Sequence, residues 1–77
     1  MKDIYGTTIR MGHRLALSAS DVGVVVCDID GSEYSNEYSE SSWSYLGEGI
    51  MVVTEQAGLM HLTQENSKFE KPRVLPQ

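Results

Sequence analysis

The chain has 77 residues, a formal net charge of −5 and a single cysteine, Cys27. A chain of this length forms one domain at most, and no apolar run approaches the ~20 residues that a membrane-spanning helix needs. One cysteine excludes an intrachain disulfide and fits a reducing compartment. We therefore expect a cytoplasmic, soluble protein that binds no cofactor and does not enter a membrane.

The charges are distributed unevenly along the sequence. All six basic residues lie near the two ends, at positions 2, 10, 14, 68, 71 and 73, whereas residues 15–67 contain nine acidic residues and no lysine or arginine. A surface so poor in cations repels phosphate backbones, which disfavours direct binding of nucleic acid. The acidic stretch is either a solubilising surface or a patch that meets a basic protein, for example as a nucleic-acid mimic.

The strongest strand signal is residues 22–29, VGVVVCDI, because the run is rich in β-branched side chains and an Asp-Gly turn follows it. Its apolar residues fall on both faces, and Cys27 among them is expected to be buried filler. Both sides of such a strand are covered, either by a closed barrel or by a neighbouring subunit. Before it, the sequence predicts a short edge strand at 7–9, a strand at 13–17 and a turn at 18–21.

Residues 31–49 form the most unusual segment, with six serines, three tyrosines and almost no aliphatic side chains. This composition predicts a long polar loop with one short helical turn at 41–46, which begins at a serine and ends at Gly47. Trp43 and Leu46 are three residues apart, so on such a turn both would plug the end of a barrel.

Residues 50–54 and 59–63 are expected to form a hairpin, because Gly58 in the loop between them can adopt a positive φ. Residues 68–77 are expected to be an extended or disordered tail. Short strands, one long polar loop and little helix predict an all-β fold. We expect a small SH3-like barrel of about five short strands over residues 1–67, with an OB-type barrel as the alternative.

One short segment of the chain resembles an enzyme motif. Residues 24–32, VVVCDIDGS, are similar to the first motif of the haloacid-dehalogenase-like phosphatases, whose two aspartates attack phosphorus and donate a proton beside magnesium. The resemblance implies that Asp28 is the nucleophile and Asp30 the acid. That family also needs a downstream lysine, a second acidic pair and a parallel sheet with crossover helices, for which this chain has no room. We interpret the motif as a strand that ends in a turn.

Other candidate sites for chemistry are weaker. The spacing Asp28-x-Asp30-x-Ser32 resembles the start of an EF-hand calcium loop, but Glu33 stands where that loop requires glycine. This spacing therefore indicates a weak cation site at most. The two histidines, His13 and His61, form no cluster with cysteine and accompany no Gly-x-Ser-x-Gly elbow, so zinc and a hydrolytic triad are not indicated.

The aromatic residues of the polar loop, with the glutamates between them, are the best candidates for ligand binding. Aromatic rings beside carboxylates hold cationic or peptide ligands, as the grooves of SH3 domains do. Core packing explains the tryptophan equally well, but three tyrosines among serines and glutamates predict that at least one is exposed. The candidate binding residues are Glu33, Tyr34, Glu37, Tyr38, Trp43 and Tyr45.

The pattern MGHRL…EYSNEYSESSWSYLGEGIMVVTEQAGLMHL, over roughly residues 12–62, resembles small uncharacterised bacterial proteins, some of them carried on the mobile gene cassettes of integrons. The resemblance implies a small, frequently self-associating SH3-like barrel and no activity. Residues 11–15 are also similar to the type II dihydrofolate reductases, which are tetramers of such barrels. The Val-Gln-Ile-Tyr strand with which those enzymes bind their ligands reads Ile-Met-Val-Val here, at 50–53.

The expected function is therefore a non-enzymatic interaction module. It either forms a homo-oligomer or binds a basic protein or peptide through the acidic, tyrosine-rich loop. The alternatives are a small-ligand binder or enzyme built at a subunit interface, and an acidic inhibitor of a nucleic-acid-binding protein.

Overall fold

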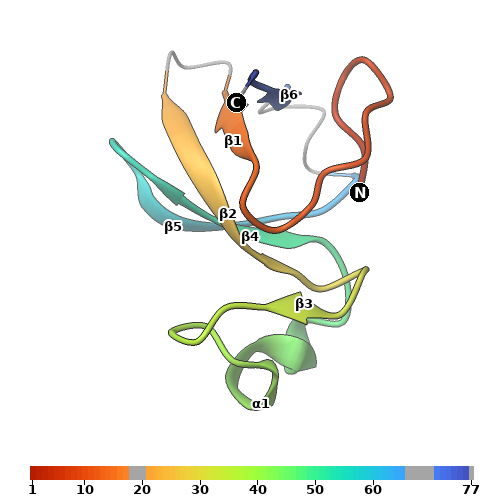
Figure 1. Ribbon diagram of the computed structural model, residues 1–77, viewed down its shortest axis with the longest axis vertical. Helices are drawn as coiled ribbons and strands as arrows, with labels where there is room; N and C mark the ends of the chain where they lie inside the picture. Colours follow the sequence, from red (N-terminus) through yellow and green to blue (C-terminus); the bar gives the residue numbers. More distant parts are fainter. Residues whose placement is uncertain (18–20, 66–70, 77) are drawn as a thin grey trace.

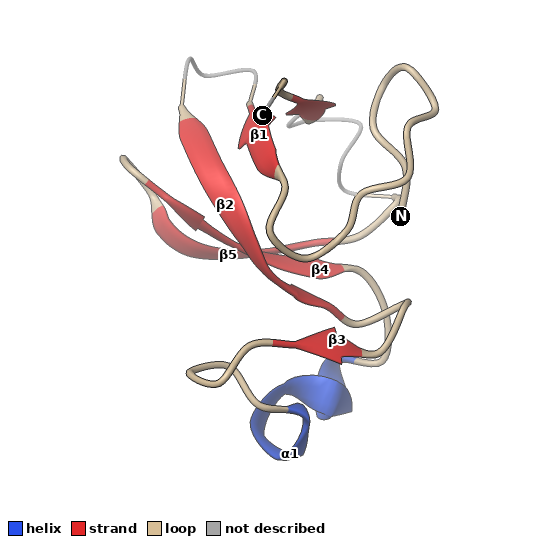
Figure 2. Ribbon diagram, in the orientation of Figure 1, coloured by secondary structure: helices blue, strands red, loops and turns tan. Residues whose placement is uncertain are grey.

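Antiparallel strands form a single twisted sheet in the computed structural model of the chain, which describes residues 1–17, 21–65 and 71–76 (Figure 1). The strands are β1 (Arg14–Ala16), β2 (Val22–Asp28), β3 (Glu33–Tyr34), β4 (Ile50–Thr54), β5 (Gly58–Leu62) and β6 (Arg73–Val74). The one short α-helix, α1 (Glu40–Trp43), continues into a 3-10 turn at Ser44–Leu46, at the opposite end of the molecule from β6 (Figure 2).

The strand order is β5-β4-β2-β1-β6, and β3 pairs only with the end of β2. This arrangement confirms the predicted all-β fold, the strand at β2 and the β4–β5 hairpin, in which Gly58 has a φ of 72°. In the part of the chain that the structure describes, β5 does not pair with β6, so the sheet is not closed. The barrel stays a prediction.

Two end segments differ from the sequence-based expectation. Residues 7–9 are not a strand, because only Thr8 makes an isolated bridge, with Lys2. Residues 71–76, expected in the tail, include β6, which pairs with β1 and places Val74 opposite Leu15. Pro72 beside it is fully buried. Residues 18–20 of the predicted turn at 18–21, and the start of the expected tail, lie outside the described residues.

The main hydrophobic core lies on one face of the sheet. Strand pairing places Val25 opposite Val52 and Ile50 opposite Leu62. Side chains directly opposite each other in an antiparallel sheet point to the same face, so these four residues share it. The core cluster consists of Ile9, Leu15, Leu17, Val25, Ile50, Val52 and Leu62.

A second core lies on the other face of the same strands. The pairing of β2 with β4 shifts register between Val25 and Cys27, which brings Cys27 opposite Met51. These two residues and Ile29 form a separate buried cluster. The chain's own loop covers this cluster, with Tyr34, Tyr38, Trp43 and Leu46 packed against it. The predicted cover on both sides of β2 therefore comes in part from the polar loop.

Two buried aspartates fasten loops to the sheet. Asp3 accepts backbone hydrogen bonds of 2.8–2.9 Å from its own loop and from Val74, so it joins the N-terminal loop to β6. Asp21 accepts bonds of 2.9–3.3 Å from Val22 and from the loop at 56–57 that connects β4 with β5. Burial alone would raise the pKa of each carboxyl, but the hydrogen bonds outweigh it, and both pKa values lie below the ordinary value.

These lowered pKa values predict acid sensitivity. A carboxyl whose pKa is lowered by folding stabilises the protein fully above its unfolded pKa, about 4, and loses that effect as the pH falls through the folded pKa. The free energy of unfolding, measured with urea at constant ionic strength, should therefore be level near neutral pH and fall below about pH 4. Asp21→Asn should make the fall less steep. A free energy of unfolding that is unchanged down to about pH 2 would contradict the stabilising role given to the Asp3 and Asp21 carboxylates.

Candidate functional site

The polar loop at residues 31–49 is held in place from both ends. At its start, β3 pairs with the end of β2 through Tyr34 opposite Cys27. Helix α1 begins after Ser39, whose carbonyl accepts the N–H groups of Ser42 and Trp43, each at 3.1 Å. The 3-10 turn ends at Gly47, which has a φ of 80°. The structure thus confirms the predicted helical turn and its glycine stop.

Three of the predicted site residues mainly anchor this loop. Tyr34, Tyr38 and Trp43 are half-buried and pack against the second core. The ring centroids of Tyr38 and Trp43 lie 6.1 Å apart in a tilted arrangement. The hydrophobic cover that aliphatic residues usually supply is thus provided by aromatic rings, which bury much area with few rotatable bonds.

Tyr45 is the aromatic residue that the loop presents to solvent. Its side chain is 75% exposed, yet its ring stacks on Trp43 with centroids 6.4 Å apart and planes 24° from parallel. Trp43 therefore contacts the second core and also supports the exposed ring. This confirms the prediction that at least one loop tyrosine is exposed.

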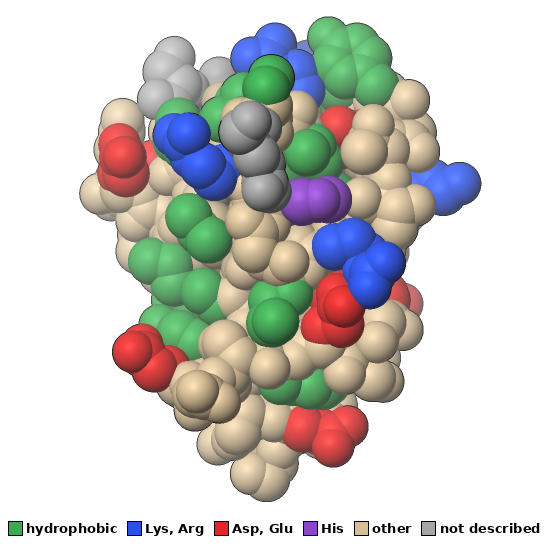
Figure 3. Space-filling view, in the orientation of Figure 1, with side chains coloured by type: hydrophobic (Ala, Val, Ile, Leu, Met, Phe, Trp, Pro, Cys, Tyr) green, Lys and Arg blue, Asp and Glu red, His purple; other side chains and the backbone are tan. Residues whose placement is uncertain are grey.

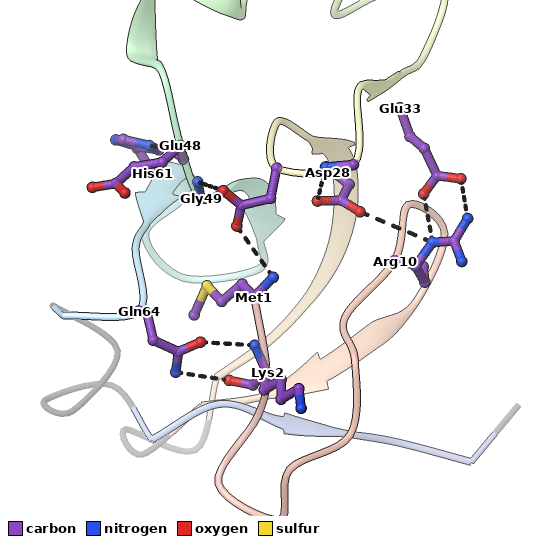
Figure 4. A network of polar contacts seen from close by, with 11 residues as sticks. Met1, Lys2, Arg10, Asp28, Glu33, Glu48, Gly49, His61 and Gln64 are labelled. Atoms are coloured by element: carbon purple, nitrogen blue, oxygen red, sulfur yellow. Dashed lines mark hydrogen bonds and ion pairs between the residues drawn. The ribbon is translucent and has the colours of Figure 1, made fainter.

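The two predicted glutamates differ in their surroundings. Glu33 forms a bidentate ion pair with Arg10, at 3.0 and 2.6 Å (Figure 4). It also accepts the N–H of Met11. The hydrogen bond from Arg10, followed by that from Met11, lowers the pKa of Glu33 to about 2. Glu37 is exposed. Glu33 therefore already has a cationic partner, whereas Glu37 faces solvent.

Both aspartates of the phosphatase-like motif bind their own chain. Asp28 is only 3% exposed, and its carboxylate accepts the N–H of Gly31 at 3.1 Å. Asp30 accepts the N–H of Gly49 at 3.1 Å and lies 3.1 Å from the amino group of Met1. These contacts match a strand that ends in a turn, and a carboxylate as buried as that of Asp28 is out of reach of a phosphate.

The thiol of Cys27 and the imidazole of His61 contribute to packing and to backbone hydrogen bonding. The thiol of Cys27 is fully buried and donates to the carbonyl of Tyr38 at 3.1 Å, and burial raises its pKa. His61 lies on the face of β5 that also carries Leu59, and its Nε2 is 2.7 Å from the carbonyl of Glu48. Within residues 1–17, 21–65 and 71–76, no group of three metal-binding side chains is found. No helix there has the length and apolar character to cross a membrane.

A row of exposed apolar side chains was not predicted from the sequence. Strand pairing aligns Val24, Val53 and Leu59 across β2, β4 and β5, and their side chains are 42%, 36% and 41% exposed. They lie on the same face as the second core, because Val53 is two residues from Met51 along β4. Figure 3 shows hydrophobic side chains gathered on this side of the molecule, near β5. The loop therefore covers only part of this face.

A comparison of the chain with protein families, with curated proteins and with solved structures found no match in any of the three. The resemblance to small cassette-borne proteins stays a prediction, and the functional inference depends on the geometry of this chain.

The roles of the two stacked rings can be separated by mutation. Trp43→Ala should lower the free energy of unfolding by about 2 kcal/mol, less than the loss of a fully buried aromatic, because Trp43 is half-buried. Tyr45→Ala should change it by less than about 0.5 kcal/mol, because that side chain is mostly exposed. Urea unfolding of both variants measures the difference. Equal losses would show that Trp43 does not anchor the loop.

Proposed function

We propose that the chain is a binding module that captures an arginine- or lysine-rich segment of another protein on the pair of rings formed by Trp43 and Tyr45. The observation that carries the proposal is an exposed tyrosine held in place by an anchored tryptophan. A ring that is already ordered loses little conformational entropy when a ligand binds, so contact with it contributes more to affinity.

The charges around the ring pair favour a cationic ligand. Glu37, Glu40 and Glu48 belong to the same loop and are exposed, and none of them forms an ion pair among the described residues. Guanidinium and ammonium groups are attracted both to the face of an aromatic ring and to carboxylates beside it. Glu33 contributes less than the sequence suggests, because Arg10 already occupies its carboxylate.

The exposed apolar row extends the surface that a peptide can contact. Val24, Val53 and Leu59 lie on the sheet face that the loop leaves open. Exposed apolar groups that adjoin polar ones are typical of protein-binding surfaces. A peptide that places a cation on the ring pair can therefore lay apolar side chains on this row. The preferred ligand combines basic and aliphatic residues.

A peptide titration tests this assignment. We expect a fluorescein-labelled peptide with alternating arginine and leucine to bind, and Tyr45→Ala to weaken binding about tenfold, the size of a partly desolvated cation–π contact. Tyr45→Phe should bind normally, because stacking and cation–π contacts do not need the hydroxyl group. Fluorescence polarisation at low salt measures the dissociation constants.

Two controls make the result specific. Tyr5→Ala removes an equally exposed tyrosine, 71% exposed, that lies in the N-terminal loop, and it should leave binding unchanged. A peptide with citrulline in place of arginine keeps the shape but loses the charge, and it should bind weakly. Equal binding by Tyr45→Ala and the unmutated chain would show that the rings are not the binding site.

A further inference from the structure

A small cavity lies at the other end of the molecule, beside β1 and β6. Its volume is about 180 Å³, and it is lined by Ile4, Ala16, Leu17, Lys71 and Arg73. Cavities that hold metabolites usually measure about 300–1,000 Å³, so this one is small for such a ligand. A volume of this size suits a single large side chain. The lining combines three aliphatic side chains with two cationic ones.

The cavity lining carries two cationic side chains, Lys71 and Arg73. Within the described ranges, no carboxylate forms an ion pair with Lys71 or Arg73. Asp3 is close in the fold, but its carboxylate is used by the backbone N–H groups of its own loop and of Val74. The cavity can therefore attract an anionic group that approaches from outside the molecule.

The acidic loop and the basic cavity lie far apart in one molecule. Figure 1 is drawn with the longest axis vertical, and it shows α1 at one end of that axis and β6 at the other. The molecule measures 31 Å in its longest dimension. In Figure 3, lysine and arginine side chains lie in the upper and middle parts of the molecule and none is seen at the lower end, whereas acidic side chains occur in all three parts. Tyr45 and the cavity of the same chain therefore cannot meet.

We propose that the acidic loop of one copy docks into the basic cavity of a second copy, so that the chains associate head to tail. Tyr45 enters the cavity and packs against its aliphatic lining residues, while Glu40 and Glu48 approach Lys71 and Arg73. This inference rests on the proposed function and names the basic partner of the ring pair as a second copy of this chain. Charge complementarity favours this partner, since Lys71 and Arg73, which form no ion pair among the described residues, lie at the end of the molecule opposite the acidic loop.

The geometry determines the form of the assembly. A head-to-tail contact joins two different surfaces, so each added copy still exposes one free loop and one free cavity. The average mass should therefore rise steadily with protein concentration and not stop at a dimer. Because the contact depends on exposed charges, it should weaken at 0.5 M salt, where the screening length is only about 4 Å.

Complementary variants test the proposal by light scattering on a sizing column and by sedimentation. Lys71→Glu with Arg73→Glu reverses the cavity's charge and leaves the loop unchanged. Tyr45→Ala with Glu48→Lys removes the loop's contacts and leaves the cavity. Each variant alone should be a monomer. An equimolar mixture should form a dimer and nothing larger, because only one loop and one cavity remain functional.

A control variant and a check of folding complete the test of head-to-tail association. Arg14→Glu, a charge reversal on an exposed residue outside the cavity lining, should associate like the unmutated chain. Circular dichroism checks the fold of each variant, and Lys71→Gln replaces the double cavity variant if that one unfolds. A mixture that stays monomeric, or a loop variant that still associates by itself, would overturn the proposal. A monomeric unmutated chain that binds the arginine peptide through Tyr45 would reject self-docking while supporting the proposed function.

Discussion

The requirement to cover both faces of β2 governs this structure. The strand is apolar on both sides, and it pairs with β1, β3 and β4. One face supplies Val25 to the main core, and a shift in register turns Cys27 toward the second core. Exposed apolar area is unfavourable in water, so the second face needs a cover of its own. In this small chain, the polar loop at residues 31–49 provides part of that cover.

This covering role explains how a serine-rich loop becomes ordered. Tyr34, Tyr38 and Trp43 use their rings to pack against the second core, and they leave the serines and glutamates at the surface. The same packing supports Tyr45 from behind through its stack on Trp43. Structure and candidate function are therefore coupled in this loop, because the residue that anchors the loop also presents the exposed ring.

Composition alone cannot separate the acidic residues that maintain the fold from those that face solvent unpaired. Asp3, Asp21 and Asp28 are buried, and their carboxylates accept backbone N–H groups in loops and turns. Glu37 and Glu40 are exposed in the polar loop and form no ion pair among the described residues. Carboxylates of the first kind maintain the fold, whereas only those of the second kind are free to attract a ligand.

The sequence by itself determined the all-β class, β2, the β4–β5 hairpin and the helical turn that ends at Gly47, because each depends on neighbouring residues along the chain. It also predicted an exposed tyrosine in the polar loop. The tertiary structure alone decided that Glu33 pairs with Arg10, that Val24, Val53 and Leu59 align in one row, and that residues 73–74 join the sheet. These features arise between segments far apart in the sequence, where strand register and packing decide which side chains meet.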